Sequence, residues 1–287
     1  MSIQKYFQMK KLILVTTIIL LAGIAELFAQ NIDTNKNRFF TTSDGVRLHY
    51  RVEGSGPSLV IFPGYGQAAS SFDKVYARLK QYFRIYTLDY RWLGNSDSPE
   101  YGAHISRFAM DAKEMIGDAG IDTFYLFAHS MGNTVAWNYL SLFGQQQLKK
   151  YILGDEAPCL ITDPSWTAVE KETYTGSATD KDIWTAFRMP SIVGQPKANK
   201  TLRDTMMERL LTEHLGNDWR DIIPTIKIPT LILMGGKSHF ASQLLWNWLH
   251  ESIKDSKLEI IKEGGHGYYS THPEIFNKIV KEYFLGE

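Results

Sequence analysis

Short apolar runs alternate with amphipathic segments along most of the chain. Runs of strand length occur at residues 58–62, 84–88, 124–128, 151–153, 230–234 and 258–261. Apolar residues recur at helical spacing between them, over 70–81, 106–119, 134–143 and 274–284. Short strands that are apolar throughout need cover on both faces, because neither side can be left in water. The pattern therefore predicts an α/β domain with a mostly parallel sheet flanked by helices. An antiparallel hairpin is expected before it, over 38–50, around the turn-forming pair Asp44-Gly45.

The alternation is broken between about residues 159 and 220. This segment is rich in aromatic side chains, among them Trp166, Trp184 and Trp219, and it contains no clear buried strand. An aromatic content of this kind disfavours a structureless loop. We therefore expect a helical cap insertion over one end of the sheet, within one domain that spans residues 30–287.

The first 29 residues have the composition of a secretory signal peptide. Lysines form a positively charged start, an apolar stretch runs from Leu12 to Ala25, and the small residue Ala29 precedes the expected cleavage site. The apolar stretch is shorter than the roughly 20 residues that span a bilayer comfortably. We expect an exported protein, periplasmic or extracellular, whose mature chain starts at Gln30. The alternative is an uncleaved anchor, which would hold the domain at a membrane.

Composition removes several classes of protein. The 287 residues are 44% hydrophobic and 22% charged, which is typical of a folded globular chain rather than a disordered one. Basic and acidic residues number 31 each, so the formal net charge is zero and no basic field indicates a nucleic-acid partner. Cys159 is the single cysteine, which excludes an internal disulfide and a cysteine-based zinc site.

The clearest chemical signal surrounds Ser130. An apolar run leads directly into this serine, a helical segment follows at once, and the small residues Ala128 and Gly132 stand two positions to either side. This strand–turn–helix pattern is typical of a nucleophile elbow, in which small neighbours allow the tight backbone that exposes a serine hydroxyl. The other interpretation is a serine that caps a helix N-terminus. The context favours the elbow.

Four segments in this order resemble the α/β-hydrolase fold family. They are Pro63-Gly64-Tyr65-Gly66, the stretch 89–96, the Ser130 elbow and Gly264-Gly265-His266-Gly267. The resemblance extends over roughly residues 38–286 and implies that fold. It also implies His266 as general base, because the order serine before histidine fits the family and a serine needs a base within hydrogen-bond reach.

The resemblance further implies an oxyanion hole made by the backbone amides of Tyr65 and Met131. Relatives often carry a histidine where this chain has Pro63. The exchange leaves the donating amide in place but removes a side chain that usually braces the loop. Asp89 and Arg91 are expected to brace the neighbouring loop rather than to react.

The triad acid is displaced from its usual position. Relatives mostly carry it in the loop after the strand 230–234, but here that loop has no carboxylate, and Ser238 stands about where the aspartate belongs. Some members take the acid from the end of the strand after the elbow helix, where this chain has Asp155 and Glu156. Strand alternation directs one of the two toward the site, and the position at the strand end favours Asp155 over Glu156.

These residues predict an exported serine hydrolase that cleaves an ester or related acyl bond of a small molecule through an acyl-enzyme, with no cofactor or metal. Amide cleavage, carbon–carbon cleavage and perhydrolysis stay open within the same family. The alternative is a catalytically inactive protein on the same scaffold that binds a small molecule or a partner. His129, next to Ser130, is expected to point away from the reacting atoms. The sequence indicates no particular oligomeric state.

Overall fold

The computed structural model describes residues 36–160 and 199–286, apart from residues 239 and 241. The predicted signal peptide at 1–29 lies outside these residues, as do residues 161–198 of the predicted cap, with Trp166 and Trp184. Within the described ranges, no helix combines the length and the apolar character needed to cross a membrane.

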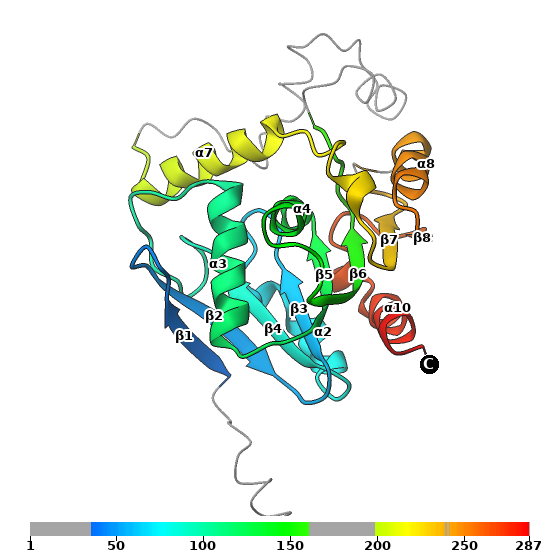
Figure 1. Cartoon of the computed structure of the whole chain (residues 1–287), viewed down its shortest axis with the longest axis horizontal. Coiled ribbons are helices and arrows are strands. Elements are labelled where there is room, and N and C mark those ends of the chain that lie inside the picture. The colour runs from blue at the N-terminus through cyan, green and yellow to red at the C-terminus, as the bar shows by residue number, and fades with distance from the viewer. Residues whose placement is uncertain (1–35, 161–198, 239, 241, 287) are drawn as a thin grey trace, which may run out of the picture. The chain divides into compact units, whose positions relative to one another are not determined.

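An eight-stranded sheet organises the described chain (Figure 1). Its strands are β1 (Asn37–Thr41), β2 (Arg47–Glu53), β3 (Ser58–Phe62), β4 (Arg84–Asp89), β5 (Phe124–His129), β6 (Leu148–Gly154), β7 (Thr230–Gly235) and β8 (Ser256–Ile261). The spatial order is β1-β2-β4-β3-β5-β6-β7-β8. β2 pairs antiparallel with β1 and β4, and all other neighbours are parallel. The predicted mostly parallel α/β sheet is confirmed.

Helices cover both faces of this sheet (Figure 1). They are α2 (Asp73–Leu79), α3 (Ile105–Asp118), α4 (Met131–Phe143), α7 (Leu202–Gly216), α8 (Gln243–Ser252), α9 (Tyr268–Thr271) and α10 (Pro273–Leu285), with short 3-10 turns η1 (Ala69–Phe72) and η2 (Ile223–Thr225). Side chains of α3, α4, α7 and α8 enter one hydrophobic core, and those of α2, α9 and α10 enter a second.

Alternate side chains of a parallel strand belong to different cores. In β3, Val60 and Phe62 lie in the first core and Leu59 and Ile61 in the second, and all four are fully buried. The two-residue period of a strand makes this division necessary. The uniformly apolar runs of the sequence arise because both faces are covered.

The two strands that follow β3 in the sequence lie on opposite sides of it in the sheet. β3 pairs with β4 on one side and with β5 on the other. Open α/β sheets place their ligand sites at the carboxyl ends of the strands beside such a switch point. The segment that begins at Pro63 follows β3, and Ser130 follows β5. The fold therefore brings these two sequence-predicted segments to the same edge of the sheet.

Helix α7 is the described part of the predicted cap. It begins with a capping box in which Thr201 and Asp204 bond each other's backbone amides. Met206 and Leu210 are buried in the first core. The Tyr65 hydroxyl lies 3.1 Å from the carbonyl oxygen of Met207, to which it donates. α7 therefore lies against the loop that follows β3.

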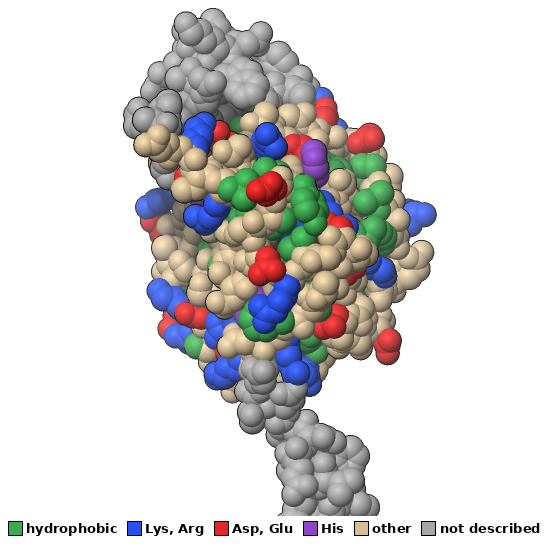
Figure 2. All heavy atoms as spheres, turned by 90° about the vertical axis from the view of Figure 1, so that its left-hand side faces the viewer, with side chains coloured by type: hydrophobic (Ala, Val, Ile, Leu, Met, Phe, Trp, Pro, Cys, Tyr) green, Lys and Arg blue, Asp and Glu red, His purple; other side chains and the backbone are tan. Residues whose placement is uncertain are grey.

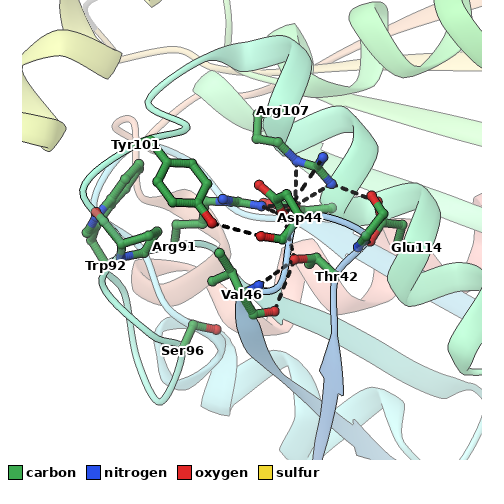
Figure 3. A network of polar contacts seen from close by, with 12 residues as sticks. Thr42, Asp44, Val46, Arg91, Trp92, Ser96, Tyr101, Arg107 and Glu114 are labelled. Atoms are coloured by element: carbon green, nitrogen blue, oxygen red, sulfur yellow. Dashed lines mark hydrogen bonds and ion pairs between the residues drawn. The ribbon is translucent and has the colours of Figure 1, made fainter.

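Asp89 and Arg91 have the structural roles expected from the sequence. Oδ1 of Asp89 accepts a hydrogen bond from the Ala69 amide at 2.7 Å, and Oδ2 accepts one from the Asn95 amide at 3.0 Å. Arg91 belongs to a network of charged side chains around Asp44 (Figure 3). These contacts hold the loop after β4.

Acidic and basic side chains are interspersed on the face of the molecule that Figure 2 shows. Neither sign forms a continuous field over the described residues of this face, which follows the balanced composition of 31 basic and 31 acidic residues. Strong electrostatic attraction of a polyanion needs a concentrated basic surface, and this face does not supply one.

Candidate active site

Ser130 occupies the sharp turn between β5 and α4. Its φ of 54° and ψ of −133° are rare for a residue other than glycine. The Ser130 amide donates to the Gly154 carbonyl at 2.9 Å, and the Ser130 carbonyl accepts from the Asn133 amide at 2.7 Å. The Asn133 side chain also donates to the Gly154 carbonyl, at 2.9 Å. The surrounding backbone therefore holds the strained geometry that a nucleophile elbow requires.

Gly132 allows α4 to begin close against β3. A Cβ atom at this position would lie 2.1 Å from the carbonyl oxygen of Phe62, a separation that no side chain could adopt without moving the strand. The Gly64 position is similarly restricted, because a Cβ there would lie 2.9 Å from the Cβ of Ser130. The small residues of the sequence motif thus reflect close backbone approach on both sides of the serine.

His266 and Asp155 come from the loops after β8 and β6. The distance from His266 Nδ1 to Asp155 Oδ2 is 2.6 Å. The Asp155 side chain is completely buried, whereas 28% of the His266 side chain is exposed. A neutral His266 that donates its Nδ1 hydrogen to this carboxylate presents Nε2 as a proton acceptor. The pair has the arrangement of acid and base in a catalytic triad.

Two further donors bind the Asp155 carboxylate. The Gly235 amide donates to Oδ1 at 2.9 Å, and the Ser238 hydroxyl donates to Oδ2 at 2.5 Å. Ser238 stands where relatives mostly carry an aspartate, and here the loop after β7 supplies a hydroxyl that donates to the Asp155 carboxylate. Hydrogen bonds to an ionised carboxylate are stronger than neutral ones, and they offset the cost of its burial.

Glu156 contacts a different histidine. Its Oε1 accepts from the Ala157 amide at 2.8 Å, and its Oε2 lies 3.5 Å from Nε2 of His214 on α7. Burial, with a smaller electrostatic contribution from nearby His266, lowers the pKa of His214 to about 3. Glu156 therefore belongs to the contact between β6 and α7.

The backbone turn at Asp155 decides which carboxylate meets His266. The sequence argument assumes that the strand continues past Asp155, but β6 ends at Gly154 and Asp155 has a φ of 50°. Alternation is therefore the wrong reason for separating Asp155 from Glu156. The positive φ turns the chain away from the strand path at Asp155, whose Oδ2 lies 2.6 Å from Nδ1 of His266.

The loop after β3 is braced by Gln67. Its side-chain Oε1 accepts from the Gly64 amide at 2.7 Å, and its main-chain amide donates to the Gly64 carbonyl at 3.2 Å. Gln67 thus supplies a brace for the loop that lacks the histidine often found in relatives.

Met131 is the first residue of α4, where an amide has no partner within the helix. Burial raises the pKa of Tyr65 to about 12, so its hydroxyl stays a donor to α7.

Sequence reasoning missed the contact that His129 makes with His266. The His129 and His266 ring centroids are 4.7 Å apart. Nε2 of His129 lies 2.7 Å from the main-chain carbonyl oxygen of His266. One signal in the sequence could have indicated such a contact: His129 is a polar residue at the end of an apolar strand. Nothing in the sequence indicated the partner, which lies 137 residues away.

Cys159 is separate from this group of residues. It is buried, with 2% of its surface exposed, as expected for a free cysteine that packs as a small apolar side chain. Over the described ranges, no set of three or more histidine, cysteine, aspartate and glutamate residues is arranged to hold a metal ion.

The fold and these residues can be compared with known proteins. The sequence profile of the alpha/beta hydrolase family matches residues 59–279. The chain belongs to the alpha/beta hydrolase family. The family resemblance expected from the four motifs is confirmed.

Members of the alpha/beta hydrolase family resemble the chain along most of its length. A human protein named serine hydrolase BPHL is 24% identical over 273 residues, which cover 91% of this chain and 90% of the relative. A pimeloyl-acyl-carrier-protein methyl ester esterase of Vibrio campbellii is 22% identical over 256 residues, which cover 82% of this chain and 98% of the relative. The structure of the esterase EaEST from Exiguobacterium antarcticum has a TM-score of 0.67 at 24% identity. The match covers 85% of this chain and 98% of the esterase. Together the relatives support hydrolase activity in general.

Proposed function

We propose that this chain is an exported serine hydrolase that cleaves an ester or related acyl bond of a small molecule through an acyl-enzyme. The observation that carries the proposal is the 2.6 Å contact between His266 Nδ1 and Asp155 Oδ2, at the edge of the sheet where Ser130 has a φ of 54°. The serine hydrolase and methyl ester esterase among the relatives support the reaction class.

In the acylation half-reaction, the Ser130 Oγ attacks the acyl carbon and its proton passes to Nε2 of His266. Asp155 orients the imidazole and stabilises its charged form. The bond from the acyl carbon to the leaving alkoxide then breaks, and His266 returns the proton to that oxygen. The products of this step are a free alcohol and an acyl group on Ser130.

In the deacylation half-reaction, a water molecule replaces the alcohol. His266 accepts a proton from the water as the oxygen attacks the acyl carbon, and it then returns the proton to Ser130 Oγ as the acyl–serine bond breaks. The backbone amides of Tyr65 and Met131 stabilise the oxyanion in both halves. Loss of one such donor typically costs about 10²–10³-fold in kcat.

Labelling with a fluorophosphonate probe tests the proposal. The purified wild-type protein should label covalently and should hydrolyse p-nitrophenyl butyrate. Ser130→Ala should lose both properties while its circular dichroism spectrum is retained, and His266→Ala should lose nearly as much turnover because triad members act as a unit. Turnover by a folded Ser130→Ala protein would exclude the assigned nucleophile. A wild-type protein that neither labels nor turns over would favour the inactive binding protein.

Export has its own test. Fractionation of the producing cells should recover the protein outside the cytoplasm, and N-terminal sequencing should find Gln30 as its first residue. A chain starting at Met1 in the membrane fraction would indicate the uncleaved anchor. A chain starting at Met1 in the cytosolic fraction would contradict export.

A further inference from the structure

A continuous series of hydrogen bonds runs from the loop after β3 to the loop that carries His266. The Gly64 amide donates to Gln67 Oε1 at 2.7 Å. Gln67 Nε2 lies 3.1 Å from His129 Nδ1, and His129 Nε2 lies 2.7 Å from the carbonyl oxygen of His266. The series therefore joins the main chain of the loop after β3 to the main chain of the loop after β8, through two side chains that the proposed mechanism does not use.

The two ends of the series fix the direction of every bond in it. The Gly64 amide can only donate and the His266 carbonyl can only accept. His129 must then carry a hydrogen on Nε2 and, when neutral, accept at Nδ1. That acceptor requires the amide nitrogen of Gln67 and leaves Oε1 for Gly64. Oε1 is also 3.3 Å from Nδ1, but a neutral His129 that donates from Nε2 has no hydrogen on Nδ1 to give to it.

Packing holds the middle of the series in place. His129 is fully buried, and its ring centroid is 4.8 Å from that of Tyr269. The Tyr269 hydroxyl accepts a second hydrogen bond from Gln67 Nε2 at 3.1 Å. Gln67 is half-buried, and its rotation would leave Nδ1 of the fully buried His129 without this donor, which favours one geometry for the network.

We infer that Gln67 and His129 are positioning residues that hold the oxyanion loop and the main chain of His266 at a fixed separation across Ser130. The inference rests on the proposed function, since it assigns these two residues a part in that reaction. His129 is buried and donates to backbone, so it acts through His266 and not on substrate. Reacting groups that are misplaced by about 1 Å can cost about 10²-fold in rate.

Two substitutions at residue 129 separate its two bonds. His129→Gln retains a donor about where Nε2 lies and so keeps the bond to the His266 carbonyl. His129→Asn retains an acceptor about where Nδ1 lies and loses that bond. Gln67→Met keeps the side-chain length of Gln67 and removes both of its polar groups. His250→Gln is the matched control, because His250 is exposed on α8 and contacts Ser256.

Steady-state kinetics on p-nitrophenyl butyrate should distinguish these variants. His129→Asn and Gln67→Met should each lose about 10- to 100-fold in kcat with little change in KM, because the network sets geometry and not ground-state binding. His129→Gln should lose less than His129→Asn, because it keeps the bond to the His266 carbonyl and gives up only the link to Gln67, and His250→Gln should match the wild type. The double variant His129→Asn with Gln67→Met should be no slower than its slower parent, since both substitutions break one series.

Equal losses in His129→Gln and His129→Asn would overturn the inference, as would losses that multiply in the double variant or that appear in KM alone. A second readout does not depend on activity. In ¹⁵N spectra of histidine-labelled protein, the signals missing from His129→Gln identify His129, which should be the neutral Nε2–H tautomer and should shift in Gln67→Met. A Nδ1–H tautomer overturns the inference. The Nε2–H tautomer in a wild-type protein without fluorophosphonate labelling would instead refute the proposed function.

Discussion

Asp155 combines a left-handed backbone with a completely buried carboxylate. A non-glycine residue in such a conformation costs about 1–3 kcal/mol, and an unpaired buried carboxylate is far less favourable still. Three donors offset these costs, namely the Gly235 amide, the Ser238 hydroxyl and Nδ1 of His266. An acid at the end of β6 therefore depends on the loop after β7. This dependence explains why the loop carries a short hydroxyl side chain where relatives mostly carry the acid.

Asp155→Asn should lower kcat by about 10⁴-fold, because the amide would bond the wrong tautomer of the imidazole. Glu156→Gln is the matched control and should lose far less, since Glu156 contacts His214 and Ala157. Ser238→Asp should restore part of the activity of Asp155→Asn, because residue 238 already reaches the Asp155 carboxylate at 2.5 Å. The measurement is turnover of p-nitrophenyl butyrate. Similar losses in both single variants would contradict the assignment of Asp155.

Local signals in the sequence were enough to predict Ser130 and His266 as members of one candidate site. The elbow is a strand, a turn and a helix in direct succession, and the Gly-Gly-His segment is equally compact. Gln67 and Ser238 could not be assigned contacts in this way. Gln67 meets His129 across 62 residues, and Ser238 meets Asp155 across 83. Hydrogen bonds between loops depend on how the strands are ordered in the sheet, which the periodicity of a single chain does not specify.

At the scale of elements, the parallel strands β3, β4, β5 and β7 were predicted to within one residue, because burial on both faces makes them largely apolar. β6 and β8 begin earlier than predicted, with the exposed residues Lys149 and Lys257 in the added segments. Helix α8 was missed. Its buried residues Leu245, Trp246 and Leu249 have helical spacing, but the element is only three turns long and lies beside a stretch of polar loop. The helix α7 was expected only as part of a cap. It packs its apolar side chains into the first core together with one histidine, His214.

The buried position of His214 on α7 should make stability depend on pH. Burial and nearby His266 lower the pKa of His214 to about 3, whereas a histidine in the unfolded chain titrates near about 6.5. Between these values the unfolded chain binds a proton that the folded chain does not. The free energy of unfolding therefore falls as the pH drops through this window, by at most about 5 kcal/mol at 1.36 kcal/mol per pKa unit.

Urea denaturation between pH 7 and pH 4 measures this effect. His214→Gln cannot titrate but keeps a donor toward Glu156, so its stability should fall less steeply with decreasing pH than that of the wild type. His250→Gln, an exposed histidine on α8, should follow the wild-type curve. Parallel curves for His214→Gln and the wild type would show that His214 does not carry the acid sensitivity.

At the scale of the whole domain, a charged network joins parts of the chain that are far apart in sequence (Figure 3). Nε and Nη2 of Arg91, in the loop after β4, bind Asp111 of α3 at 2.6 and 2.8 Å, and Nη2 also binds Asp44 of the β1–β2 turn at 2.8 Å. The Arg91 and Asp111 side chains are completely buried. Arg203 of α7 donates to the Trp92 carbonyl at 2.8 Å in the same loop. The network therefore ties the antiparallel edge of the sheet to the helices.

Asp111→Asn should reduce the free energy of unfolding by about 3–5 kcal/mol, the cost of removing one partner from a buried ion pair. The substitution keeps the shape of the side chain and leaves the buried Arg91 guanidinium with less compensating charge. Glu282→Gln is the matched control. It removes the same charge from an exposed pair with Lys278 on α10, and it should cost less than about 1 kcal/mol. Urea denaturation at pH 7 measures both values.

Because Asp111 contacts Arg91 and Arg107 and not the triad, the folded Asp111→Asn protein should keep the wild-type kcat. A loss of stability no larger than that of Glu282→Gln would show that the network does not hold the domain together.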